Sequence, residues 1–198
     1  MNGHLDVVTF LASLESVDVT AHNNMALIWA CSNGHYATVK FLLSLSGVNA
    51  AAMQNECFIS ACGEGHLQIA EFLLAVPGVN PTAQQNAAFR RACLGGYAHI
   101  VKFLLAIPGI DPTSLFNDAF RAACMEGHLE VCNLLLSVPS VDPSDVDNEA
   151  FRTACQFGHT AIVMRLLQLS SVDPSARNNQ AVRHACRNGR MRFIGTST

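Results

Sequence analysis

A cysteine, a glycine and a histidine recur at fixed spacing along this 198-residue chain, and cysteine and histidine are both metal-ligand types. The frame reads ACSNGH at 30–35, ACGEGH at 61–66, ACMEGH at 123–128 and ACQFGH at 154–159. Each copy could supply half of a tetrahedral zinc site, whose ligands are thiolate sulfur and imidazole nitrogen. The alternative is a repeated structural unit whose packing needs these residues.

The glycine of this frame favours the repeated unit, because it returns every 31 residues. It stands at positions 3, 34, 65, 96, 127, 158 and 189, with no insertion or deletion between them. A fixed period of about 20 to 50 residues indicates a solenoid, in which each unit buries its faces against its neighbours.

Each unit is predicted to contain two short helices and an extended turn. In the unit 117–147, Asn117 stands where a helix needs an N-cap, and apolar residues follow at i, i+3 and i+4 spacing. Gly127 is expected to end this first helix at positive φ. The second helix, 128–138, is apolar almost all round, as a helix buried on several sides would be. A proline then stops it in several units.

The cysteines are predicted to be free thiols that fill space between helices. Six of the eight occupy one column of the repeat, at 31, 62, 93, 124, 155 and 186. Stacked helices lie about 8–10 Å apart, whereas a disulfide needs Cα atoms within about 7 Å. Members of this column in neighbouring units therefore cannot pair.

Metal binding and catalysis are not predicted. Each unit offers at most two ligands, and Tyr97 and Arg190 replace the histidine in two copies of the frame. The chain contains neither a strand–GxxxxGK phosphate loop nor a nucleophile beside a base outside the repeat register. We therefore expect no metal, no cofactor and no enzymatic activity. The histidines are expected to bond backbone or a neighbouring unit.

The pattern AC..GHL.VV..LLL followed by GVN or GVD resembles the ankyrin repeat over nearly the whole chain. The usual unit of that family is two residues longer, and its Thr-Pro-Leu-His opening is replaced here by sequences such as NEAF and DAFR. The resemblance implies an all-α helix-turn-helix solenoid of about six 31-residue repeats. It also implies a non-catalytic scaffold that binds a protein partner through its concave surface.

The resemblance further implies that columns which vary from unit to unit line the concave groove. The candidate partner-binding residues in these columns are Trp29, Asn33, Glu64, Arg91, Leu94, Leu115, Phe116, Met125, Glu126, Gln156 and Phe157. The apolar and aromatic members are the expected anchors, because contact energy concentrates in a few such side chains. The alternative is that each is an isolated surface hydrophobe or packs on the adjacent unit.

A second pattern suggests a structural ladder. Six residues before each glycine, the first two complete units carry isoleucine and the later ones carry arginine. In the turn fifteen residues after the glycine, asparagine accompanies isoleucine and aspartate accompanies arginine. We hypothesise that Arg90, Arg121 and Arg152 each bond the turn carboxylate of their own unit.

Charge is unevenly distributed. Residues 1–150 hold 5 Lys or Arg against 14 Asp or Glu, and residues 151–198 hold 7 Arg against one Asp. A basic end could dock an acidic partner, although drift among solvated surface positions explains it as well. The acidic remainder would repel nucleic acid, so a nucleic-acid partner is disfavoured.

We expect residues 1–194 to form a single array, with 195–198 a disordered tail. No apolar run reaches the roughly 18–20 residues of a membrane helix, and the N-terminus lacks a basic leader. The predicted location is cytoplasmic, with nuclear as the alternative. Neither end looks like a polar capping unit, so the chain could self-associate through uncapped ends. The rival to a binding scaffold is a structural or degenerate array, a fragment of a longer solenoid without a dedicated partner.

Overall fold

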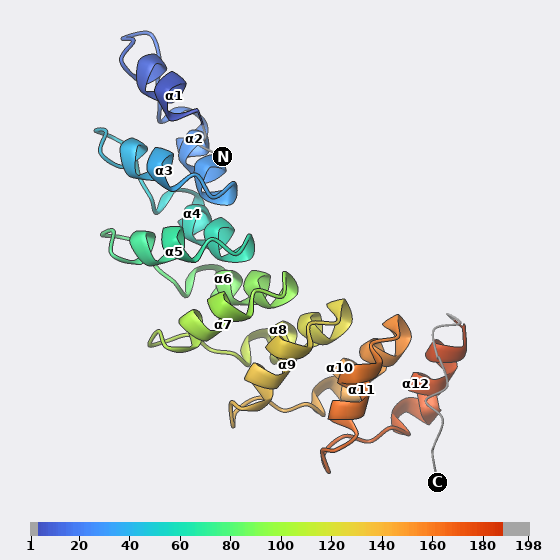
Figure 1. Ribbon diagram of the computed structural model, residues 1–198. Helices are drawn as coiled ribbons and strands as arrows, with labels where there is room; N and C mark the ends of the chain where they lie inside the picture. Colours follow the sequence, from blue (N-terminus) through green and yellow to red (C-terminus); the bar gives the residue numbers. More distant parts are fainter. Residues whose placement is uncertain (1–3, 188–198) are drawn as a thin grey trace. The chain divides into compact units, whose positions relative to one another are not determined.

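The computed structural model describes residues 4–187, and within that range it contains twelve helices and no strand (Figure 1). The helices are α1 (Leu5–Ala12), α2 (Ala21–Ser32), α3 (Tyr36–Leu42), α4 (Ala52–Gly63), α5 (Leu67–Leu74), α6 (Ala83–Leu94), α7 (Ala98–Leu105), α8 (Ser114–Glu126), α9 (Leu129–Leu136), α10 (Asp145–Phe157), α11 (Thr160–Leu166) and α12 (Ala176–Arg187). The predicted all-α, helix-turn-helix repeat architecture is confirmed.

The helices divide into two classes that alternate along the chain. The first helices of the repeats are α2, α4, α6, α8, α10 and α12, and the second helices are α1, α3, α5, α7, α9 and α11. From α2 to α11, each first helix packs against the second helix of its own repeat. The predicted glycine at positive φ separates the two helices, as at Gly127 with φ of 88°.

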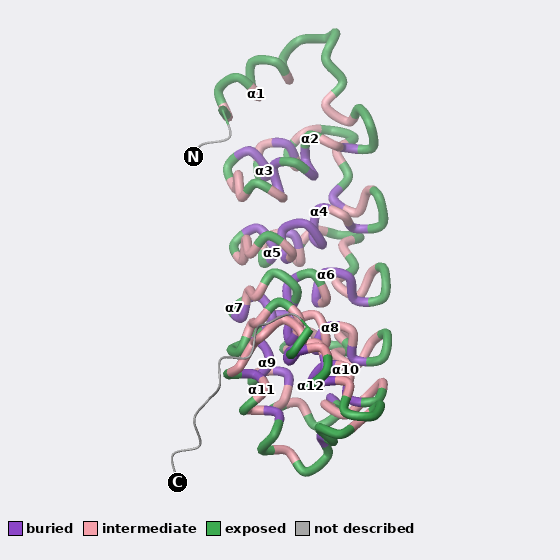
Figure 2. Tube along the Cα trace, turned by 90° about the vertical axis from the view of Figure 1, so that its right-hand side faces the viewer, coloured by how far each residue is buried: buried purple, intermediate pink, exposed green. Residues whose placement is uncertain are grey.

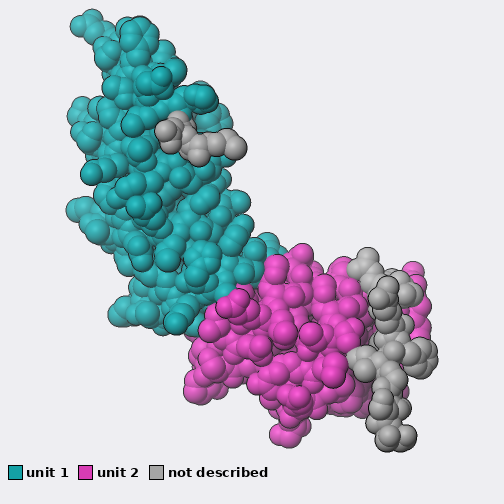
Figure 3. Space-filling model, in the orientation of Figure 1, with its two compact units in different colours: residues 1–111 teal, residues 112–198 magenta. Residues whose placement is uncertain are grey.

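The chain forms two compact units, residues 1–111 and 112–198 (Figure 3). In the first unit, α4 packs between α2 and α6; in the second, α10 packs between α8 and α12. The single array over 1–194 stays a prediction. Residues 195–198, and the glycines at 3 and 189, lie outside the described residues.

The hydrophobic core of each compact unit lies between the first and second helices of its repeats (Figure 2). One column, seven residues before each glycine, is filled by phenylalanine in four repeats. Phe58, Phe89 and Phe120 have no exposed surface, and Phe151 is nearly as buried. Burial of each such side chain contributes about 1.5–3 kcal/mol to folding.

The second to fourth residues of every first helix lie in the left-handed region, a feature not predicted from the sequence. These left-handed turns are residues 22–24, 53–55, 84–86, 115–117, 146–148 and 177–179, with φ between 49° and 71°. The third residue is asparagine in all six. Asparagine tolerates this conformation better than most residues, because its short polar side chain can bond locally. The right-handed helix starts only after it.

The asparagine of the left-handed turn holds the following repeat rather than capping its own helix. In four of the repeats its Oδ1 atom accepts a hydrogen bond from the backbone N–H of the residue 25 positions later. The four pairs are Asn24 with Asn49 at 3.0 Å, Asn55 with Asn80 at 2.7 Å, Asn86 with Asp111 at 3.3 Å and Asn148 with Asp173 at 2.9 Å. Each bond joins the start of one first helix to the turn that leads into the next.

Candidate binding surface

The cysteine column is buried, as predicted for packing residues. Its members at 31, 62, 93, 124 and 155 are buried, Cys186 is exposed, and all are free thiols. The two cysteines outside the column lie against it: the Sγ atoms of Cys124 and Cys132 are 3.4 Å apart, and a hydrogen bond to Cys57, together with burial, raises the pKa of Cys31. Among residues 4–187, no three potential ligands converge on a point that could hold a metal ion.

The histidine and glycine of the recurring frame make contact across neighbouring repeats. The Nε2 atom of His66 lies 3.0 Å from the carbonyl oxygen of Ser32, and that of His159 lies 2.7 Å from the carbonyl oxygen of Met125. The His159 ring covers Gly127 so closely that a Cβ atom there would lie 2.6 Å from it. The expected bond from histidine to a neighbouring unit is confirmed for these two residues, and the frame has a structural role.

The hypothesis that arginine bonds the turn aspartate of its own repeat is wrong for Arg121 and Arg152. Asp173 Oδ1 instead accepts bonds from the backbone N–H of Ser175 at 2.8 Å and from its hydroxyl at 2.6 Å. Asp142 is held in the same way by the serine two residues later. The hydroxyl bond and the backbone bond lower the pKa of Asp173. These aspartates stabilise the turn locally and leave the arginines to other partners.

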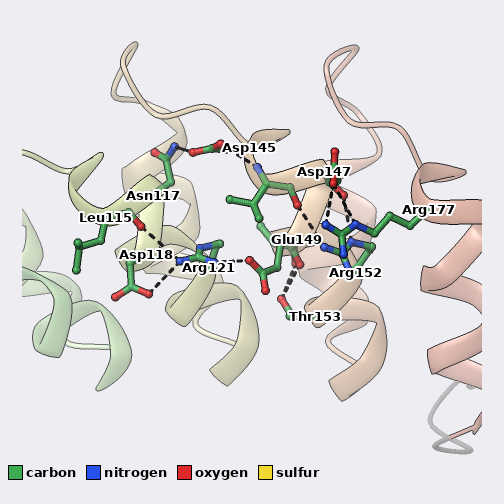
Figure 4. A network of polar contacts seen from close by, with 12 residues as sticks. Leu115, Asn117, Asp118, Arg121, Asp145, Asp147, Glu149, Arg152, Thr153 and Arg177 are labelled. Carbon is green, nitrogen blue, oxygen red and sulfur yellow. Dashed lines mark hydrogen bonds and ion pairs between the residues drawn. The ribbon is translucent and has the colours of Figure 1, made fainter.

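Arg152 holds the left-handed turn at the start of its own helix (Figure 4). Its Nε donates to the carbonyl oxygen of Asp147 at 3.1 Å, and its Nη2 to that of Val146 at 3.2 Å. Carbonyl groups in such a turn lie outside the regular helical pattern, so a side-chain donor satisfies them. The third group, Nη1, donates to Gln180 Oε1 of the next repeat at 2.9 Å. Burial, followed by the charge of Arg177, lowers the pKa of Arg152.

The same arrangement recurs along the arginine column. Arg90 donates to the carbonyl oxygens of Gln84 and Gln85, and Arg183 to that of Arg177.

Arg121 approaches the carbonyl oxygen of Leu115 at 3.4 Å and forms an ion pair with Glu149 of the next repeat. Glu149 and Gln180 were not among the candidate residues predicted from the sequence, and each stands 28 residues after its arginine. A polar or acidic residue 28 positions after an arginine was the sequence signal that could have identified these partners.

The candidate residues of the first unit lie at its surface, in two kinds of setting. Trp29, Asn33, Glu64 and Leu94 are exposed. Arg91, also exposed, forms an ion pair with Glu56 of the preceding repeat at 2.6 Å. The side chain of Arg91 is therefore partly committed to a neighbouring repeat.

The candidate residues of the second unit differ more clearly in their exposure. Leu115, Phe116 and Glu126 are exposed. Met125, Gln156 and Phe157 are only half-buried, and two of them contact other repeat residues. The Phe157 ring stacks on His159, and Gln156 Oε1 lies 3.1 Å from the His184 ring.

Phe116 is the most exposed large hydrophobic residue in the described part of the chain, with 74% of its surface accessible. It occupies the middle position of the left-handed turn. The equivalent positions of the other repeats hold Asn23, Gln54, Gln85, Asp147 and Asn178. An aromatic ring thus replaces an amide or carboxylate at a site that faces solvent.

The helix pairs, the glycine between their helices and the 31-residue period define a solenoid of stacked helical repeats. Residues 1–54 match the family model described as ankyrin repeats (3 copies). The resemblance to ankyrin repeats indicated by the sequence pattern is thus confirmed at the N-terminus, and the rest of the described chain consists of similar helical repeats. No curated protein matches it. None of the helices in the described range is both long and apolar enough to cross a lipid bilayer.

Proposed function

We propose that this chain is a non-catalytic scaffold that binds a protein partner through its left-handed turns and first helices, the concave surface of the predicted array. Ankyrin repeats generally serve in protein interaction, and the family is typically non-catalytic. A reducing compartment, the cytoplasm or the nucleus, fits a chain whose cysteines are free thiols.

The observation that carries this proposal is the exposure of Phe116 in a column that is otherwise polar. Leu115, beside it, is exposed as well. Binding energy in protein interfaces concentrates in a few aromatic and large apolar side chains that become buried on association. These two side chains are therefore the proposed anchors, and Glu126 in the same unit would lie toward the polar rim.

The backbone that presents Phe116 is held in place before any partner arrives. Arg121 bonds the carbonyl oxygen of Leu115, and Asn117 Nδ2 donates to Asp145 Oδ2 of the next repeat at 2.8 Å (Figure 4). An anchor on a fixed loop loses less conformational freedom when it binds, which favours affinity.

The test compares Phe116→Gln with Met164→Gln. Met164 is a half-exposed residue of the second helix α11, so its substitution removes similar apolar surface from another part of the repeat. Proteins captured from the native cell by the unmodified chain are identified and their affinities measured. We expect Phe116→Gln to weaken binding at least about tenfold, and Met164→Gln to have little effect. Equal binding by the two variants would contradict the proposal, and the absence of any specific partner would favour the structural array.

A further inference from the structure

The N-terminal helix α1 exposes a face that every other second helix buries (Figure 2). In α3, α5, α7, α9 and α11, the positions four and eight residues after the glycine are at most 4% exposed. The residues at these positions of α1, Val7 and Leu11, are 49% and 42% exposed. Phe10 and Leu14 extend the apolar surface. This face of α1 is where a second helix normally receives the first helix of its own repeat.

The helix α12 exposes the complementary face. The position seven residues before the glycine is at most 3% exposed in the five preceding first helices, but Val182 of α12 is 52% exposed. The cysteine three residues before the glycine is buried in the same five helices, whereas Cys186 is exposed. This face of α12 is where a first helix normally receives its second helix.

The two exposed faces are therefore the two halves of one repeat. In the repeat of α8 and α9, the corresponding halves pack so closely that Cys124 and Cys132, three residues before and five residues after the glycine, have Sγ atoms 3.4 Å apart. The residues that take these two positions at the ends of the chain are Cys186 in α12 and Val8 in α1.

The charges of the two ends are also complementary. The first 20 residues contain Asp6, Glu15 and Asp18 and no Lys or Arg, whereas α12 contains Arg177, Arg183 and Arg187 and no Asp or Glu. All six side chains belong to exposed residues, and one of them, Arg177, already forms an ion pair with Asp147 of the preceding repeat. Opposite charges on two surfaces favour their encounter and fix their orientation.

We propose that the partner of these faces is a second copy of the chain, with α12 of one copy and α1 of the next forming a composite repeat. In this arrangement α12 also lies beside α2 of the other copy, as α10 lies beside α12 within one chain. It covers Ala26 and Trp29, which are three residues apart on one side of α2 and exposed. Such a head-to-tail contact generates chains, or rings where the rotation closes.

This inference does not rest on the proposed function, because it uses the end faces and not the left-handed turn that carries Phe116. The proposed function and the proposed self-association can also be contradicted independently of each other. Phe116→Gln leaves both end faces intact, so it tests partner binding without changing self-association.

The first experiment measures mass in solution by light scattering and sedimentation velocity. The monomer has a mass of 21.3 kDa, and we expect the average mass to rise with concentration and fall with added salt. Leu11→Asp places a charge on an already exposed position and weakens association at least about tenfold, while the control Met164→Asp on α11 does not. A monomer that persists to about 100 µM would overturn the proposal.

The second experiment traps the composite repeat covalently. Val8→Cys places a thiol opposite Cys186 of another copy, in the positions held by Cys132 and Cys124 within one repeat. Diamide takes up the two electrons and two protons released as the disulfide forms. We expect species larger than a dimer on a non-reducing gel, lost when Cys186→Ser is added.

Two controls complete the trapping experiment. The unmodified chain stops at a Cys186-linked dimer. Thr9→Cys places its thiol at the neighbouring position, which is exposed in every second helix, and yields far less of the larger species. A Val8→Cys product that stays at monomer mass would show that another part of the same chain covers α12, and would overturn the proposal.

Discussion

The Oδ1 atom of Asn55 accepts a hydrogen bond from the backbone N–H of Asn80 at 2.7 Å, and so fixes the turn that leads into the next repeat. The equivalent bond between Asn148 and Asp173 measures 2.9 Å. Both asparagines are buried and in the left-handed region. One residue type thus satisfies an unusual backbone conformation and joins two repeats.

Replacement of this asparagine is expected to be costly. Asn148→Ala removes the bond to Asp173 and places alanine at positive φ, so we expect a loss of about 2–3 kcal/mol in the free energy of unfolding. Asn178→Ala is the matched control, because Asn178 is also in a left-handed turn but its side chain is exposed. Urea unfolding measures both, and equal losses would show that the hydrogen bond contributes nothing.

Arg152 is expected to stabilise its left-handed turn. Arg152→Met keeps most of the apolar stem but leaves the carbonyl groups of Val146 and Asp147 and the amide of Gln180 without their donors. We expect a loss of about 1–3 kcal/mol by urea unfolding. Arg183→Met, in the same column, removes one bond from an exposed arginine and should cost less than about 1 kcal/mol. A smaller effect at Arg152 than at Arg183 would refute this role.

Gly127 tests whether close ring packing adds to the cost of positive φ. Gly127→Ala brings a Cβ atom to 2.6 Å from the His159 ring, whereas Gly47→Ala, also at positive φ, meets only the Thr20 methyl group at 3.5 Å. Both variants are strained by the backbone, and we expect Gly127→Ala to lose roughly 1–3 kcal/mol more. In a His159→Ala background this excess should disappear; its persistence would assign the loss to the backbone alone.

The buried thiols make stability fall at alkaline pH. Burial raises the pKa of Cys155 from 9.0 to about 11, so the unfolded chain releases this proton at a lower pH than the folded chain. The contribution of the protonated Cys155 thiol to the free energy of unfolding is complete below pH 9.0 and is lost as the pH rises toward about 11. Urea unfolding across this range, with Cys155→Ala as control, should give a steeper fall for the unmodified chain. Parallel curves would contradict the assignment.

Much of the fold was predictable because it depends on residue types that recur without a gap. The glycine at 31-residue intervals gave the repeat, and the apolar spacing gave the two helices. The packing role of the cysteine column followed from the helix separation, and the bond from His66 to its neighbour followed from its place at the start of a second helix.

The left-handed turn could not be predicted in the same way. Its first residues include His22, Met53, Leu115 and Val146, which share no preference for positive φ. Their conformation is set by the asparagine that follows and, in four repeats, by an arginine further along the helix. The hypothesis paired each arginine with the turn aspartate of its own repeat, because residues of one repeat were expected to be the nearest in space. Its partner in the next repeat lies on the adjacent first helix.

The side-chain bonds between repeats never reach beyond an adjoining repeat, because their partners lie between 25 and 35 residues apart. Excision of one whole period inside a unit, such as 55–85, would therefore remove Asn55 and Asn80 together and leave the bonds of Asn24 to Asn49 and of Asn86 to Asp111 in place, although Arg91 would lose Glu56. The number of repeats can therefore change without breaking contacts between distant repeats, because each repeat interacts only with its neighbours.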